Sequence, residues 1–230
     1  MRKALQDKLR WLDPFTYVDE FVMPHVNPSG DKAIETIVYL FFAFLFAYVL
    51  YNFVLAFLLG SPTPLVIVYS GSMEPVLYRG DVVILTKASG LDVDEVQVDF
   101  AVGGRNLFEF ADISYERTPS GSLLAKTLKI QGAQYPFDKS GPIVVYYSSL
   151  RRQDIIHRAV LKLKATDGDY LVTFGDNNPT IDQDCRPNTQ CVNLHAVPAG
   201  SLKGKYLFHL PLIGYIKLLI FDDLPRLLFG

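Results

Sequence analysis

An uncharged apolar segment constrains this chain more than any other feature of its sequence. Residues 37–59 are an almost continuous run of Leu, Phe, Tyr, Val and Ala, and no Asp, Glu, Lys or Arg occurs between Glu35 and Glu74. A helix over this run rises roughly 35 Å at about 1.5 Å per residue, which is enough to cross a hydrocarbon layer of about 30 Å. Apolar side chains cover every face of that helix, unlike the surface helix of a soluble domain. The sequence therefore predicts one transmembrane anchor over residues 36–60.

The surroundings of this segment predict that the anchor is retained and that the N-terminus is cytoplasmic. The run is too long for a cleaved signal peptide and lacks a small-residue cleavage pattern before Ser61 and Pro62. The first basic residue after it is Arg79, whereas the leader 1–35 carries several: Arg2, Lys3, Lys8, Arg10 and Lys32. Because basic loops favour the cytoplasmic side, the rest of the chain is expected outside a cell membrane, or in the lumen if the membrane is endoplasmic reticulum.

Composition limits what the remaining chain can be. About 170 residues follow the anchor, enough for one domain, which we place at 61–210, and an apolar tail at 211–230. The net charge of −2 and the lack of a basic tract argue against a nucleic-acid partner. No cluster of Cys and His has zinc-ligand spacing. Cys185 and Cys191 are close enough in sequence for a disulfide on the outer side of a membrane, and two free thiols are the alternative.

Beyond the anchor, the pattern predicts a mainly β fold. The segments rich in β-branched and aromatic residues and bounded by turn residues are 82–85, 107–115, 123–130, 143–147, 155–163, 170–174 and 202–208. Several short strands with irregular turns indicate a compact, partly barrel-like β domain. Residues 89–154 are expected to form extra hairpins inserted between two core strands. The tail is strongly apolar, but charged residues and Pro225 interrupt it too often for a second span, and membrane association of the tail is left open.

Ser72 follows the anchor closely and is a candidate nucleophile. A serine hydroxyl needs a base within hydrogen-bond reach, and a carboxylate that orients this base. Of the four histidines, His25 precedes the anchor, His195 follows the cysteine loop and His209 lies in an apolar stretch. His157 lies inside a strand pattern that holds an imidazole rigidly, although a structural histidine is the competing interpretation. Taken alone, the turn 175–182 is ordinary loop chemistry or a weak calcium site.

Four short segments occur in an order typical of one enzyme family. They are Ser-Gly-Ser-Met-Glu-Pro at 70–75, Gly-Asp-Val-Val at 80–83, His-Arg-Ala-Val at 157–160, and Gly-Asp-Asn-Asn at 175–178 followed by Asp182. With the N-terminal anchor, they resemble the type I signal peptidases, in their archaeal and endoplasmic-reticulum branch. The resemblance extends from the anchor to about residue 214, leaving out the leader and the insert.

The resemblance implies a role for each matching residue. The nucleophile is Ser72, and the general base is His157, at the position where bacterial relatives carry Lys. The acid of the triad is Asp182, and Asp176 matches a second aspartate that supports the site. Asp184 is near enough in sequence to be an alternative to Asp182.

An oxyanion hole and a substrate class are also implied by the resemblance. The hydroxyl of Ser70 and the backbone N–H of Ser72 match its donors, with a plain turn serine as the alternative for Ser70. The implied activity is removal of signal peptides from secretory preproteins by acyl transfer, with no metal or organic cofactor. Two other functions stay open: a peptidase dedicated to one exported precursor, and a membrane-anchored β module that binds exported chains without chemistry. Accessory subunits are left open.

Overall fold

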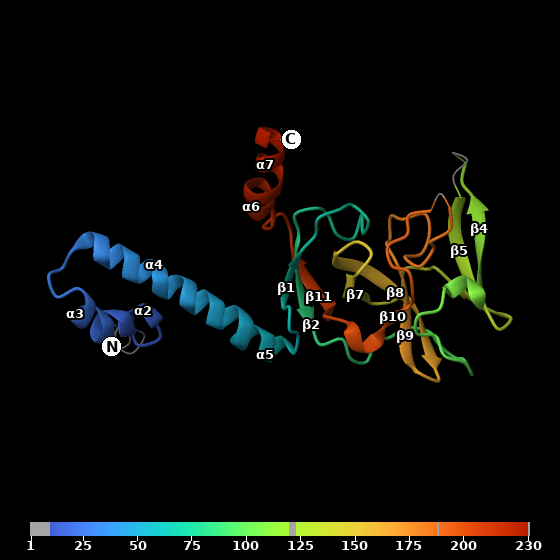
Figure 1. The fold of residues 1–230 in the computed structure, drawn as a ribbon, viewed down its shortest axis with the longest axis horizontal. Helices are drawn as coiled ribbons and strands as arrows, with labels where there is room; N and C mark the ends of the chain where they lie inside the picture. Colours follow the sequence, from blue (N-terminus) through green and yellow to red (C-terminus); the bar gives the residue numbers. More distant parts are fainter. Residues whose placement is uncertain (1–9, 120–122, 188, 230) are drawn as a thin grey trace, which may run out of the picture. The chain divides into compact units, whose positions relative to one another are not determined.

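The chain divides into two compact units, Met1–Leu58 and Leu59–Gly230. The computed structural model describes residues 10–119, 123–187 and 189–229, and Figure 1 shows a helical first unit and a second unit made mostly of strands. The basic residues Arg2, Lys3 and Lys8, which contributed to the predicted orientation, lie outside the described residues.

A long continuous helix dominates the first unit. Short helical segments precede it: α2 (Pro14–Tyr17), η1 (Val18–Val22) and α3 (Met23–Val26). The long helix comprises α4 (Lys32–Val49), the π-helical stretch η2 (Leu50–Leu55) and α5 (Ala56–Leu59). It starts where the Asp31 carboxylate accepts a hydrogen bond of 2.7 Å from the backbone N–H of Ala33, which satisfies an otherwise unpaired helix donor.

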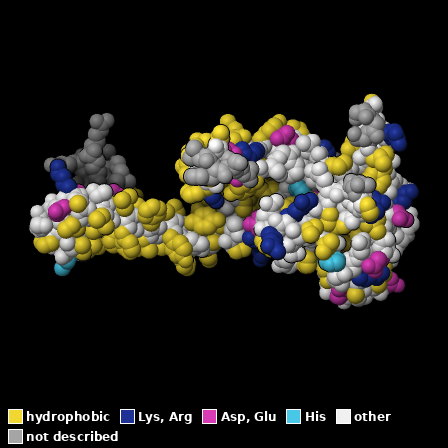
Figure 2. Space-filling view, turned by 45° about the horizontal axis from the view of Figure 1, so that its top comes forward, with side chains coloured by type: hydrophobic (Ala, Val, Ile, Leu, Met, Phe, Trp, Pro, Cys, Tyr) yellow, Lys and Arg dark blue, Asp and Glu magenta, His cyan; other side chains and the backbone are white. Residues whose placement is uncertain are grey.

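This helix has the length and composition of a single-pass membrane anchor. Among the described residues, the helix over Lys32–Leu59 is the one that is long and apolar enough to cross a membrane, and its most apolar stretch is not buried by the rest of the chain. Figure 2 shows hydrophobic side chains along its surface. The segment expected to be the anchor is therefore helical, and this helix begins at Lys32, four residues before the predicted boundary at residue 36.

The second unit is built on a large, mostly antiparallel sheet. Its strand order is β1 (Leu65–Ile67), β2 (Val82–Thr86), β11 (Gly204–Leu210), β7 (Ile143–Ser148), β8 (Gln153–Ala165), β9 (Gly168–Phe174) and β10 (Val197–Pro198), with β3 (Glu95–Gln97) parallel to β8. This confirms the predicted mainly β class. The predicted barrel character is not complete, since no pairing among the described residues joins β1 to β10 and closes the sheet.

A separate three-stranded antiparallel sheet comes from the segment expected to be an insert. Its strands are β4 (Ala111–Arg117), β5 (Leu123–Ile130) and β6 (Ala133–Pro136), whereas β3 and β7 from the same segment join the large sheet. Residues 107–109, expected in a strand, form the 3₁₀ turn η3 (Leu107–Glu109). The reason is local, because the side chain of Asn106 accepts a hydrogen bond from the N–H of Phe108 while Glu109 bonds back to Asn106.

Strand β8 contributes to two parts of the core. Its register with β9 shifts between Ala159 and Leu161, as at a β-bulge. Before the shift, Ala159 packs with residues of β7 and β9, and after it Leu161 and Leu163 pack with Leu128 of the three-stranded sheet. Strand β8 is thus paired within the large sheet and also packs against the three-stranded sheet.

The chain ends in a helix that packs on the turn before β2. This C-terminal helix consists of α6 (Tyr215–Leu218), η5 (Leu219–Asp223) and α7 (Leu224–Phe229). Arg79 forms ion pairs of 3.0 and 2.7 Å with Asp222 and Asp223. Gly80 has a φ of +91°, which glycine adopts without strain, and a Cβ there would lie 2.2 Å from the ring of Tyr215. Both the backbone conformation and the lack of space therefore favour glycine at this position. The 3₁₀ turn η4 (Ala199–Ser201) lies between β10 and β11.

Candidate active site

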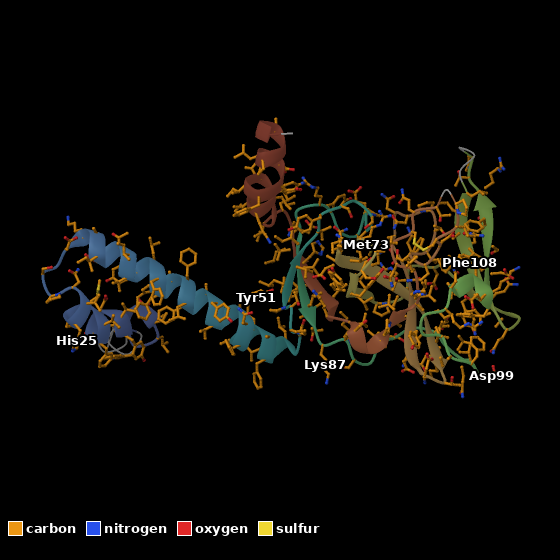
Figure 3. The ribbon with its side chains drawn as sticks, viewed as in Figure 1. His25, Tyr51, Met73, Lys87, Asp99 and Phe108 are labelled. Carbon is orange, nitrogen blue, oxygen red and sulfur yellow. A yellow bond between two sulfur atoms is a disulfide. The ribbon has the colours of Figure 1, made fainter. Side chains whose placement is uncertain are left out.

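The loop that carries Ser72 is held by burial of its neighbours. It connects β1 to β2, and Met73 (Figure 3) and Leu77 are almost completely buried. The N–H groups of Val76 and Leu77 both donate to the carbonyl of Met73, at 2.9 and 3.0 Å. Because Met73 anchors the turn in the apolar core, Ser72 is left partly exposed beside it.

Strand β8 brings His157 to Ser72. The imidazole is 3% exposed, and its Nε2 lies 2.9 Å from Ser72 Oγ. On its other side, Nδ1 lies 2.7 Å from each carboxylate oxygen of Asp182. A carboxylate only accepts hydrogen bonds, so Nδ1 carries the proton and the Nε2 lone pair faces the hydroxyl. This tautomer is the one that a general base needs.

Backbone hydrogen bonds fix Asp182 on both sides. Its N–H donates to the carbonyl of Thr173 at 2.9 Å, and its own carbonyl accepts from Val192 and Asn193 at 2.9 and 3.0 Å. A disulfide between Cys185 and Cys191 closes the loop that lies between these two contacts. The Asp182 carboxylate is therefore buried and held in place before it contacts the imidazole.

The other two candidate carboxylates do not contact His157. Asp176 forms a two-pronged ion pair with Arg158, at 2.8 and 2.7 Å, and Arg158 also donates to the carbonyl of Gly141. Since Arg158 follows His157 on a strand, its side chain leaves the opposite face of the sheet. Asp176 thus holds a position next to the triad and does not form part of it.

Asp184 is held by a different set of partners. Its carboxylate accepts hydrogen bonds from Tyr115 at 2.6 Å, Thr180 at 2.7 Å and Arg186 at 2.8 Å. Burial raises the pKa of Asp184, but the hydrogen bonds from Arg186, Tyr115 and Thr180 outweigh it and lower the pKa to about 2. Through Tyr115, Asp184 links the loop after β9 to strand β4.

The turn after β9 contains contacts that the sequence did not predict. The backbone N–H of Asn177 donates to the carbonyl of Ser72 at 2.8 Å, and its side-chain amide donates to the carbonyl of Gly71 at 3.0 Å. A Cβ at Gly175 would lie 2.8 Å from His157 Nε2. One turn therefore holds the nucleophile loop and leaves space for the base. The only signal in the sequence was the Gly-Asp-Asn-Asn run itself.

Ser70 lies next to the nucleophile. Its Oγ is 3.2 Å from Ser72 Oγ, and its side chain is exposed. The three remaining histidines have other partners. Nδ1 of His25 is 3.2 Å from the carbonyl of Phe21, Nδ1 of His195 is 3.0 Å from the carbonyl of Arg105, and Nδ1 of His209 is 3.0 Å from the hydroxyl of Tyr206. Of the described histidines, His157 is thus the one placed to act on Ser72.

A serine hydroxyl, an imidazole and a buried carboxylate in series, carried on a β scaffold, form the arrangement of a serine hydrolase. The sequence comparisons are consistent with this class. No family model matches the chain. The chain is nevertheless a distant homologue of the catalytic subunits of the signal peptidase complex, which confirms the predicted resemblance.

Three of these relatives are fungal proteins named signal peptidase complex catalytic subunit SEC11. The protein of Verticillium alfalfae is 26% identical over 166 residues, which is 72% of this chain and 69% of the relative. That of Sclerotinia sclerotiorum is 28% identical over 160 residues, covering 70% and 65%, and that of Schizophyllum commune is 26% identical over 177 residues, covering 74% and 71%. The chain thus spans about two thirds of the length of the curated relatives it matches.

Proposed function

We propose that this chain is a membrane-bound serine endopeptidase that removes N-terminal signal peptides from secretory preproteins. The observation that carries the proposal is the unbroken series Ser72 Oγ, His157 Nε2 and Asp182, with contacts of 2.9 and 2.7 Å. A module that only binds exported chains has no need for these three groups to meet. The substrate class is inferred from the relatives, which are named as catalytic subunits of the signal peptidase complex.

The geometry supports a two-step acyl transfer. His157 Nε2 takes the proton of Ser72 as Oγ attacks the scissile carbonyl carbon, and Asp182 stabilises the imidazolium that forms. The proton then passes from Nε2 to the departing amine, leaving the acyl group on Ser72. Water, deprotonated by the same imidazole, releases this acyl group. The N–H of Ser72 and the hydroxyl of Ser70 are the proposed donors to the oxyanion.

The most direct test is Ser72→Ala in the purified, detergent-solubilised full chain. Cleavage of a preprotein with a signal peptide is expected to fall by at least about four powers of ten, because the other groups provide no replacement nucleophile. Ser70→Ala is the matched control, with a smaller loss of about ten- to a thousandfold if it donates to the oxyanion. Near-normal cleavage by Ser72→Ala contradicts the proposal. Cleavage of one precursor among many tested favours a dedicated peptidase.

We also propose that the helix Lys32–Leu59 spans the membrane with the N-terminus in the cytoplasm. Ser72 comes thirteen positions after Leu59 in the sequence, and thirteen steps of fully extended chain span at most about 45 Å. The nucleophile therefore stays within reach of a signal peptide embedded in the same bilayer. The orientation is tested by protease protection of the leader in sealed vesicles.

The C-terminal helix is a second proposed membrane contact. The helix is held to the domain by the buried side chain of Leu218 and by the ion pairs of Arg79. Its exposed apolar side chains are Ile216, Leu219, Ile220, Phe221, Leu224 and Leu227. Phe221 is 73% exposed and Leu227 is 82% exposed. Such a contiguous apolar face is unusual on a soluble surface and suits the lipid boundary to which the anchor tethers the unit.

An introduced fluorophore tests this contact, because both cysteines of the chain are joined in the disulfide. In proteoliposomes, a polarity-sensitive dye on Phe221→Cys is expected to shift to the blue and to be quenched by spin-labelled lipids. The matched control is the same dye on Lys129→Cys, which is exposed on β5. Equal quenching at the two positions contradicts lipid contact by the helix.

A further inference from the structure

A buried tyrosine also contacts the carboxylate of the triad. The hydroxyl of Tyr146 donates a hydrogen bond of 2.8 Å to Asp182 Oδ2. Tyr146 and Asp182 are both completely buried. The tyrosine therefore touches the triad without any access to a substrate.

Strand register explains how Tyr146 reaches this position. Val144 of β7 lies opposite His157 of β8, and Tyr146 lies opposite Ile155. Residues two apart on a strand project from the same face, so Tyr146 and His157 are diagonal neighbours on one face of the sheet. From this diagonal position the long side chain of Tyr146 reaches the Asp182 carboxylate that His157 also contacts.

The hydrogen bonds behind Tyr146 all point toward Asp182. The backbone N–H of Thr173 donates to Gln183 Oε1 at 3.1 Å, so the other end of this amide, Nε2, faces Thr173 Oγ1 and donates to it at 3.1 Å. Thr173 Oγ1 then donates to the hydroxyl of Tyr146 at 3.2 Å. Because that hydroxyl already accepts from Thr173, its own proton is directed to the Asp182 carboxylate. Each bond polarises the next in the same direction.

The protonation state of Tyr146 suits this role. Burial, together with the negative charge of Asp182, raises the pKa of Tyr146 well above its ordinary value. The hydroxyl therefore stays a donor over the whole range in which a protease works. Other charged groups nearby are already engaged, since Arg158 pairs with Asp176 and Asp184 pairs with Arg186.

We propose that Tyr146 is a positioning residue of the active site: its hydroxyl holds the Asp182 carboxylate toward His157 Nδ1 and limits how strongly that carboxylate retains the imidazolium proton. The inference rests on the proposed function, because it assigns Tyr146 to the catalysis carried out by Ser72. Without the hydroxyl, Oδ2 loses a donor that the buried site cannot replace with water. The carboxylate then attracts the imidazolium more strongly and is less constrained in direction.

The test is Tyr146→Phe in the full chain, which removes one oxygen atom and keeps the ring. Cleavage of a preprotein at pH 7 is expected to fall about tenfold in kcat/KM, because even a small misplacement of a catalytic group lowers the rate. The fall is expected in kcat and not in KM. The acid limb of the pH profile should move to higher pH by about half a unit or more, so part of the loss is recovered at pH 8.5. The control is Tyr147→Phe, at the next residue, whose side chain is 54% exposed.

A purely structural role for Tyr146 gives a different result. It would lower the rate equally at every pH, in line with the loss of folded protein, and an unchanged acid limb overturns the proposal. Thr173→Val provides a second variant. It removes the hydroxyl that donates to Tyr146, and a smaller shift in the same direction is expected because Tyr146 keeps its own bond to Asp182.

Nuclear magnetic resonance of ¹⁵N-histidine-labelled protein separates failure of this inference from failure of the proposed function. The His157 signal, assigned by its loss in His157→Gln, is expected to titrate at higher pH in Tyr146→Phe even if no preprotein is cleaved. If the wild type cleaves no substrate but this shift occurs, the proposed function fails and the role of Tyr146 stands. If the wild type cleaves and neither the acid limb nor the signal moves, the role of Tyr146 is wrong.

Discussion

Gly175→Ala should impair catalysis without unfolding the protein. The backbone of Gly175 is outside the left-handed region, so alanine is not strained there by its conformation. The added Cβ would meet Asn178 Nδ2 at 2.6 Å and His157 Nε2 at 2.8 Å. The amide of Asn178 is the far end of a flexible side chain and can move aside. The imidazole cannot move without loss, because Ser72 and Asp182 hold it at both nitrogens.

The size of the effect follows from these distances. Ordinary contact begins at 3.4 Å, so the imidazole nitrogen must retreat by about 0.6 Å, the difference between 3.4 and 2.8 Å. The hydrogen bond to Ser72 Oγ is 2.9 Å long, and a displacement of this size removes it from the best range. Because a misplacement of about 1 Å can reduce a rate a hundredfold, we expect kcat to fall about 10- to 100-fold.

The assay is single-turnover cleavage of a preprotein by the purified full chain, with Ser72→Ala as the baseline. Gly200→Ala is the matched control, because a Cβ at Gly200 meets nothing within 4 Å. The melting temperatures of the two variants are expected to remain close to that of the wild type. Activity of Gly175→Ala within about twofold of Gly200→Ala would refute the steric argument, since a twofold change is well below the expected loss.

Three further predictions concern the charged groups around the triad. Asp182→Asn should reduce cleavage by about three to four powers of ten, because it favours the wrong tautomer of His157. Asp184→Asn should mainly lower the melting temperature. A larger catalytic loss in Asp184→Asn than in Asp182→Asn would mean that Asp184 is the triad carboxylate. The pKa of Asp184 is lowered from 3.8 to about 2, so its ionised form stabilises the fold above about pH 4. This stabilisation is lost as the pH falls toward 2. The melting temperatures of wild type and Asp184→Asn should therefore differ most at neutral pH and converge near pH 2. Arg158→Lys keeps the charge but loses the two-pronged pairing with Asp176, and it should lower both the melting temperature and the cleavage rate; an unchanged protein by both measurements would mean that the pair does not support the site.

The anchor and most strands were predictable because they depend on local composition and periodicity. An apolar run longer than the hydrocarbon layer allows few alternatives, and the strand predicted over 123–130 coincides with β5. The shortest strands, β1, β3, β6 and β10, were not predicted, since two to four residues carry too little pattern. The 3₁₀ turn at 107–109 was missed because a reciprocal side-chain cap overrides the preference of Leu and Phe for strands.

Residue type and spacing were enough to predict the membrane-length helix, the β character of the rest and a short list of candidate groups. The family resemblance implied Asp182 as the acid and left Asp184 as an alternative, and it is the folded chain that places one of the nearby carboxylates against the imidazole. Asp176, Asp182 and Asp184 lie within nine residues, yet only Asp182 contacts His157. Tyr146 was not selected at all, because its importance arises from the register of β7 against β8. Strand pairing brings residues that are distant in sequence into contact, and the alternation of side chains places adjacent residues on opposite faces of the sheet. The register between two strands cannot be predicted from the local sequence of either one.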